Sequence, residues 1–187
     1  MLHSFRKREP KIGKDAYVSE YAVVIGDVRI GDECYIGHGT ILRGDYGTIE
    51  IGSGTAVEEG VVVHAPPDDI CRIGKKVTLG HGAIIHCASI GDHAVIGMGA
   101  VLSLHSEIGK SAIVAEGSVV TMGQKVPGGV VAGGSPARVL RKTGEEDAKR
   151  WSWGKQLYID LAKEYLRDGM PRCKDSLTIL DKADDKH

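Results

Sequence analysis

The sequence has few aromatic residues and no long apolar run. Phe, Trp and Tyr make up 5% of its 187 residues, which also include 26 glycines, so we do not expect a core of large side chains. No apolar stretch approaches the roughly 20 residues of a membrane-spanning helix. None follows the basic start MLHSFRKREPKIG, as one would in a signal peptide. We therefore expect an interior of small aliphatic residues, joined by tight turns.

An excess of charge and closely paired cysteines are also lacking. The 24 basic and 25 acidic residues leave a net charge of -1 without a long run of either sign. Neither nucleic acid nor a membrane surface is therefore an expected partner. The 4 cysteines include no Cys-x-x-Cys pair. This spacing favours free thiols and a cytoplasmic location.

An aliphatic marker residue recurs at about every sixth position. It is often followed by glycine, and the fourth residue after it is usually small. Neither the helical period of 3.6 nor the strand period of 2 accounts for this spacing. The markers are Ile12, Val18, Val24, Ile30, Ile36, Leu42, Ile51, Val57, Val63, Ile73, Leu79, Ile85, Ile90, Ile96, Leu102, Ile108, Val114 and Val120.

This period predicts an all-β solenoid, a single-stranded parallel β-helix of about six coils with a C-terminal α-helix. Six residues form a short strand and a turn, three such units close one triangular coil, and the markers stack inside. We assign residues 1–125 to the β-helix with its N-terminal lead-in and residues 126–142 to an irregular cap. Residues 143–169 are expected to form a helix packed on the coils, and residues 170–187 a mobile polar tail.

Two patterns describe the expected helix. Thr143 and Glu146 have the spacing of a capping box, and Gly169 follows the last turn. An apolar stripe at a four-residue spacing is expected to dock on the flank of the coils. Its members are Trp153, Leu157, Leu161 and Tyr165.

Three histidines lie inside the repeat. His64 and His86 each follow a marker of the same face by one position, so we expect them on successive coils, roughly 4.7–4.9 Å apart. The marker points inward, so both imidazoles point outward and can share one metal ion. His81 follows Leu79 by two and is expected near another corner, within reach of a neighbouring subunit if the coils pack around a threefold axis. Three histidines with an open fourth position are typical of catalytic zinc.

The coils, with the segments ILRGDYG, GVVVH, GHGAIIH and IGMGAVL, resemble the gamma-class carbonic anhydrase family of left-handed β-helix, or isoleucine-patch, proteins. The resemblance covers Ile12 to about Tyr165. It implies left-handed coiling, a homotrimer, and metal ligands at His64, His81 and His86, with His81 donated across the interface.

The resemblance also implies other site residues. Arg43 and Asp45 match the family's Arg-Gly-Asp segment, which supports the trimer interface and the bound water. Tyr158 resembles a tyrosine that reaches the site. The segment before His64 departs from the family pattern, since Ala56 and Glu58 replace an asparagine and a glutamine. Glu58 is expected to face the same cleft, either as a proton shuttle or as a charge that raises the pKa of the bound water.

The function implied is hydration of carbon dioxide to bicarbonate at inter-subunit sites that hold Zn2+, with Fe2+ or Co2+ as alternatives. Two other functions stay open. Many hexapeptide-repeat proteins bind acyl-CoA in the same cleft and act as transferases or thioesterases, and the chain could also be a catalytically weak metal-binding scaffold. The three histidines favour the hydratase, whereas Ala56 and Glu58 keep the scaffold open.

Overall fold

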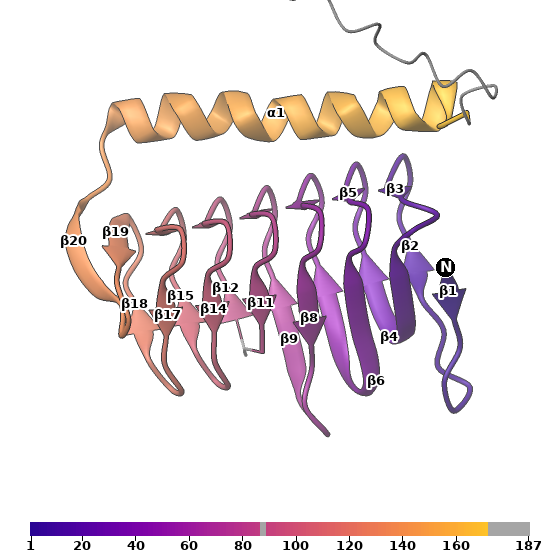
Figure 1. Cartoon of the computed structure of the whole chain (residues 1–187), viewed down its shortest axis with the longest axis horizontal. Coiled ribbons are helices and arrows are strands. Elements are labelled where there is room, and N and C mark those ends of the chain that lie inside the picture. Colours follow the sequence, from indigo (N-terminus) through magenta and orange to yellow (C-terminus); the bar gives the residue numbers. More distant parts are fainter. Residues whose placement is uncertain (87–88, 172–187) are drawn as a thin grey trace, which may run out of the picture.

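The protein is a stack of coils with one helix along its side (Figure 1), in a computed structural model that describes residues 1–86 and 89–171. One face of the stack carries seven successive parallel strands before the chain turns back, so the solenoid has about seven turns. The sequence period ended at Val120 and predicted about six. The stack continues because Val126 and Ala132 pair with Ile108 and Val114 as further markers.

The strands form two sheets. The eight-stranded sheet covers one face and contains β3 (Tyr17–Val18), β5 (Tyr35–Ile36), β7 (Ala56–Val57), β10 (Thr78–Leu79), β13 (Val95–Ile96), β16 (Ile113–Val114), β19 (Val130–Gly133) and β20 (Arg138–Lys142). The twelve-stranded sheet contains β1 (Leu2–His3), β2 (Lys11–Ile12), β4 (Val23–Ile30), β6 (Ile41–Ile51), β8 (Val62–His64), β9 (Ile70–Ile73), β11 (Ile84–Ile85), β12 (Ser89–Ile90), β14 (Val101–Leu102), β15 (Glu107–Ile108), β17 (Val119–Val120) and β18 (Lys125–Val126). Because β4 and β6 run unbroken from one face to the next, this second sheet bends around a corner.

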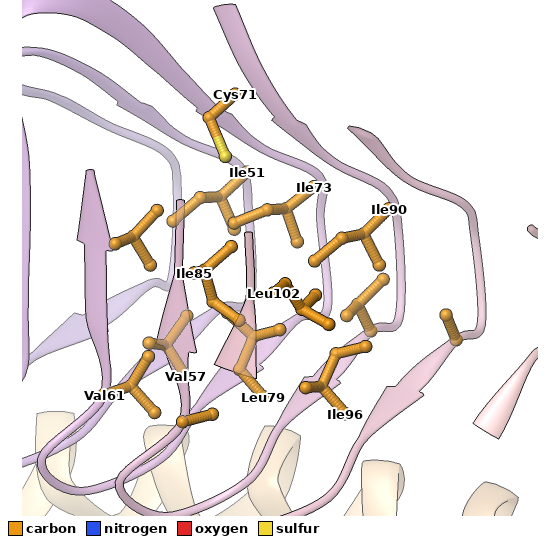
Figure 2. Packing of buried hydrophobic residues seen from close by; sticks show 14 of the residues in the cluster. Ile51, Val57, Val61, Cys71, Ile73, Leu79, Ile85, Ile90, Ile96 and Leu102 are labelled. Carbon is orange, nitrogen blue, oxygen red and sulfur yellow. The ribbon is translucent and has the colours of Figure 1, made fainter. Parts of the chain in front are cut away.

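The register of the strands places marker against marker. Ile51 pairs with Ile73, which pairs in turn with Ile90 on the next coil. Figure 2 shows such side chains filling the inside of the coils in layers, with Leu79 and Ile96 from the other sheet completing them. Markers in the middle of the stack are almost fully buried, because each coil covers the apolar interior of its neighbour.

The end of the stack is more regular than expected. Residues 126–142 were predicted to form an irregular cap, but this segment contains β19, which continues the parallel sheet, and β20, which pairs antiparallel with β19. An open sheet edge invites pairing with another chain. The strand β20 covers this edge with the sequence RVLRK, whose charged residues oppose further pairing.

The helix α1 (Glu145–Asp168) returns along the stack toward its N-terminal end (Figure 1). Its 24 residues span roughly 36 Å, close to the roughly 34 Å of seven coils. The expected capping box of Thr143 and Glu146 does not form. Gly144 is the N-cap, and its N–H donates to the Asp147 carboxylate at 2.8 Å, so the helix starts one residue later than the capping box predicted.

The face of α1 that docks on the coils includes only part of the predicted stripe, since Leu161 and Tyr165 pack against the coils. Ile159 and Ala162 are buried, whereas the side chains of Trp153 and Leu157 are 70% and 49% exposed. A four-residue spacing advances about 40° around a helix at each step, so a stripe of four such residues drifts off one face. In the part of the chain that the structure describes, no helix combines the length and apolarity needed to cross a membrane. The predicted tail lies outside the described residues from position 172 onward.

Candidate metal centre

His64 and His86 lie one above the other on neighbouring coils. Strands β8 and β11 pair Val63 with Ile85, and each histidine is the next residue along its chain. The two imidazole rings stack, with centroids 4.9 Å apart and an interplanar angle of 27°. The pair is therefore held by the register of the sheet, which fixes both side chains on one outer face.

The Nε2 atoms of both rings are buried and have no hydrogen-bond partner. A buried polar atom without a partner costs about 1–3 kcal/mol, so an unsatisfied pair of ring nitrogens indicates a missing ligand. Burial lowers the pKa of His64, and the neighbouring Arg43 and His86 lower it further, against an opposing effect of Asp45. His64 is thus held neutral, which is the form that binds a metal ion. Two adjacent imidazole donors fit a divalent transition metal such as zinc.

Arg43 and Asp45 lie beside this pair. Arg43 pairs with His64 in the register of β6 and β8. Its Nη1 donates to both oxygens of Asp45 at 3.0 and 3.2 Å. Asp45 Oδ1 lies 3.8 Å from His64 Nε2, too far for a hydrogen bond. Burial alone would raise the pKa of Asp45, but the hydrogen bonds from Arg43 and from the Tyr46 backbone lower it, so Asp45 is a fixed anion beside the two histidines.

The turn that carries Asp45 is held by a residue that the sequence did not single out. The Arg8 guanidinium donates to the carbonyl oxygens of Asp45, Tyr46 and Gly47 at 3.3, 2.8 and 2.7 Å. It also reaches Thr48 Oγ1 at 3.1 Å and Asp27 Oδ2 at 3.3 Å. Arg8 precedes the repeat, so the period gives no signal for this contact.

His81 lies apart from His64 and His86. Its side chain is 46% exposed, and both ring nitrogens face carboxylates of the same chain: Nε2 lies 3.2 Å from Glu58 Oε2 and Nδ1 lies 2.9 Å from Glu59 Oε2. Among the described residues of one chain, no group of three His, Cys, Asp or Glu side chains could hold a metal ion. At this place the described residues of one chain therefore offer two adjacent donors, His64 and His86.

Glu58 is buried rather than open to a cleft. The residue is 6% exposed, and its Oε2 accepts a hydrogen bond from the backbone N–H of His81 at 3.1 Å. Burial raises the pKa of Glu58, while His81 and a hydrogen bond from Tyr158 oppose that shift. Burial, together with Glu58, raises the pKa of the Tyr158 phenol well above its usual value, so Tyr158 is a neutral donor. Within one chain Glu58 thus lies between His81 and Tyr158 under α1, and its position toward a neighbouring subunit stays a prediction.

The same helix explains Ala56. This residue is 2% exposed and packs with Tyr35 and Ala162 in a small cluster between the coils and α1. A small side chain lets the helix approach closely.

Two residues near His81 were not predicted from the sequence, Glu59 and Tyr35. Tyr35 Oη donates to Glu59 Oε1 at 2.6 Å and thereby orients a carboxylate that faces His81. Tyr35 shares the column of Ala56 in the register of β5 and β7, which could have identified it.

Comparison with known proteins agrees with this fold and with the resemblance to the gamma class. Residues 9–44 match the family described as bacterial transferase hexapeptide (six repeats). Gamma carbonic anhydrase 2 of Arabidopsis thaliana mitochondria is 40% identical over 83% of this chain, and the alignment spans 58% of that protein. The chain spans about three fifths of the length of the two Arabidopsis relatives.

Two other relatives are covered almost completely. A carbonic anhydrase of Geobacillus kaustophilus is 32% identical over 88% of this chain and 91% of its own length. The solved structure of a hexapeptide transferase family protein from Anaplasma phagocytophilum has a TM-score of 0.81 and 35% identity, covering 88% of this chain and 98% of that one. The chain therefore belongs to the gamma-class carbonic anhydrase-like family of hexapeptide-repeat, left-handed β-helix proteins.

Proposed function

We propose that this protein hydrates carbon dioxide to bicarbonate at metal sites shared between subunits. The observation that carries the proposal is the stacked pair His64 and His86, whose buried Nε2 atoms have no partner within the chain. A catalytic zinc site needs three protein ligands and one open position. The pair supplies two of the ligands, and His64 is held in the neutral form that binds a metal ion.

The third ligand in this proposal is His81 of a neighbouring copy in a homotrimer. His81 is exposed and lies on a different part of the coil, so it is placed to reach outward and not back toward His64. In a ring of three subunits each contact uses the same two surfaces, and three identical sites result. The relatives of the gamma class support this assembly.

Zn2+ is the ion proposed, with Fe2+ and Co2+ as alternatives, because imidazole ligands suit all three. When bound, such an ion is a Lewis acid that makes water a nucleophile near neutral pH. The chain's own residues hold the ion and shape its surroundings. Asp45, fixed by Arg43, is a hydrogen-bond acceptor beside the histidines. Glu58, Glu59 and Tyr158 orient His81 and offer a route for a proton away from the site.

A second function is acyl transfer or thioester hydrolysis with acyl-CoA, and the observation favouring it is the similarity to a hexapeptide transferase family protein. A third is a metal-binding scaffold with little turnover. We propose a cytoplasmic location from the cysteine spacing alone. Two assays on protein of measured metal content separate the three functions: stopped-flow hydration of carbon dioxide, and hydrolysis of an acyl-CoA thioester. Metal-dependent hydration supports the first, metal without hydration supports the scaffold, and thioester turnover without metal supports acyl transfer.

Co-expression of two inactive variants tests whether the site is shared. His81→Ala subunits keep His64 and His86, and His86→Ala subunits keep His81. Random mixing in a trimer restores one complete site in every mixed trimer, which is about a quarter of all sites. Recovery of about a quarter of the wild-type rate supports the proposal. If the mixture stays as inactive as either variant alone, the ligands do not come from two subunits.

A further inference from the structure

A cavity of about 660 Å³ lies between α1 and one corner of the coils. The coils contribute Lys76, His93 and Ser111 to its lining, and the helix contributes Trp151 and Lys155. This volume is in the range of small-molecule sites, which are mostly apolar with a few converging polar groups. None of the cavity's lining residues belongs to the candidate metal centre.

Lys155 is the unusual member of this lining. The residue is 5% exposed, and its Nζ is buried without a hydrogen-bond partner. The ammonium lies 5.4 Å from the centroid of the Trp151 ring, and no carboxylate of the described residues forms an ion pair with it. Burial lowers the pKa of Lys155 to about 8, so most of the side chain is still protonated at neutral pH. A buried cation without a counter-charge is costly, because it has lost its water and gained no anion.

The charged groups around Lys155 increase this imbalance. Burial lowers the pKa of His93, and the ammonium groups of Lys155, Lys76 and Lys110 lower it further against an opposing effect of Asp92, so His93 is a neutral imidazole beside converging ammonium groups. Asp147 is the acidic residue of the lining, and its carboxylate is already held by Arg141 at 2.6 and 2.9 Å. Among the described residues, the cavity lining thus carries the ammonium groups of Lys76 and Lys155, and no carboxylate forms an ion pair with either of them.

The same helix shows the arrangement that would neutralise such a charge. Lys163, two helical turns after Lys155, also faces the corner of the coils, and there its Nζ lies 2.9 Å from Glu33 Oε1. At the level of Lys155, the corner carries Lys76 and His93 instead of an acid. The helix and the coils thus carry opposite charges where Lys163 meets Glu33, and like charges where Lys155 and Lys76 line the cavity. A bound anion would resolve the repulsion.

We propose that this cavity binds a small organic anion, whose carboxylate or phosphate group contacts Lys155, His93 and Lys76 and whose aromatic or apolar body packs against Trp151. Ile113 and Ile159 add apolar lining for the body, and Ser111, Ser152 and Thr143 offer hydroxyl groups. The ammonium groups and the His93 ring N–H can donate to a carboxylate or to a phosphate oxygen, so the structure assigns the charge class and leaves both acids as ligands.

Calorimetric titration of the full-length protein with four probes tests the proposal. Phenyl phosphate and phenylacetate carry both features, inorganic phosphate carries the charge alone, and benzyl alcohol carries the ring alone. We expect saturable binding of at least one aromatic anion, and weaker binding of the two partial probes. Which aromatic anion binds more tightly distinguishes a phosphate site from a carboxylate site. Binding of neither aromatic anion overturns the proposal, and equal binding of inorganic phosphate overturns the part played by Trp151.

Matched lysine variants locate the site. Lys155→Met keeps the aliphatic length of the side chain. It should lower the affinity for the anion at least about tenfold, since the loss of a hydrogen bond to a charged group changes affinity by this factor. Lys163→Met removes a lysine of the same helix that already has its partner, Glu33, and should bind as the wild type does. His93→Gln provides a second test that does not depend on how Lys155→Met folds, and it should also weaken binding. Unchanged affinity in both Lys155→Met and His93→Gln would overturn the assignment.

Discussion

The imidazole rings of His64 and His86 stack with their centroids 4.9 Å apart, and neither buried Nε2 atom has a hydrogen-bond partner. An unsatisfied pair of this kind stabilises the chain only when something binds to it. Without a ligand the two nitrogens destabilise the fold, and with a metal ion they hold it. Removing one of these nitrogens should therefore raise the free energy of unfolding of the metal-free protein and lower that of the metal-bound protein.

The substitution His86→Leu should stabilise the metal-free protein while abolishing metal binding. Leucine fills similar space without a buried acceptor, so the free energy of unfolding in EDTA should rise by about 1 kcal/mol or more. Metal content should fall to background. Denaturant titration in EDTA and elemental analysis check both results. The control is His105→Leu, because the His105 side chain is 57% exposed. This substitution should change neither the free energy of unfolding nor the metal content appreciably. A less stable apo-protein would show that His86 has a partner in solution.

His81 should depend on Glu59 for its orientation. His81 Nδ1 lies 2.9 Å from Glu59 Oε2, and Glu59 is itself held by Tyr35. Carboxylates that hydrogen-bond a metal-binding imidazole typically change metal affinity 10–100-fold when removed. Glu59→Gln should therefore weaken metal binding by about that factor, measured by competition with a chromogenic chelator. Glu50→Gln, on a different face of the coil beside Arg29 and Arg72, should leave the affinity unchanged.

Arg8 should contribute to stability and to activity through the turn that carries Asp45. Its guanidinium makes five contacts to Asp27 and residues 45–48, several of them at 2.7–3.1 Å. Arg8→Met should lower the free energy of unfolding by about 1.5–3 kcal/mol and reduce hydration as Asp45 loses its position. Arg72→Met removes an ion pair with Glu50 in which the arginine side chain is 59% exposed. It should lower the free energy of unfolding by less than about 1 kcal/mol. Equal losses in the two variants would show that the turn is held by other contacts.

The repeat allowed much of the fold, and part of the site, to be predicted from the sequence. Each marker fixes which way its neighbours point, so the column of Arg43, His64 and His86 followed from counting, and the register confirms their alignment. The period could not say which face the returning helix covers. The departures from the family pattern at Ala56 and Glu58 were interpreted as changes to the metal site, and both residues lie at the contact with α1. Lys155 gave no signal either, since a lysine in a helix is usually solvated and only the docked helix shows it buried.

The buried ammonium of Lys155 should make stability depend on pH between about 8 and 10.5. Burial lowers the pKa of Lys155 to about 8 from its usual 10.5. Between these values the unfolded chain holds a proton that the folded chain has lost, so the free energy of unfolding of the wild type rises with pH. Replacement by methionine removes this dependence. Lys155→Met should therefore be the more stable protein at pH 7 by up to about 3 kcal/mol, and the difference should close by pH 10.5.

The matched variant Lys163→Met should be less stable than the wild type at pH 7, opposite in sign to Lys155→Met. Its hydrogen bond to Glu33 raises the pKa of Lys163 above 10.5, so its stabilising contribution is present at pH 7 and disappears only as pH rises through the folded-state pKa. Urea titrations of the wild type and both variants at pH 7, 8.5 and 10, in a buffer free of organic anions, measure the two differences. If the difference in free energy of unfolding between the wild type and Lys155→Met stays constant with pH, the Lys155 ammonium is hydrated in solution. Adding phenyl phosphate at pH 7 should narrow that difference, because an anion bound beside Lys155 stabilises only the protein that keeps the charge.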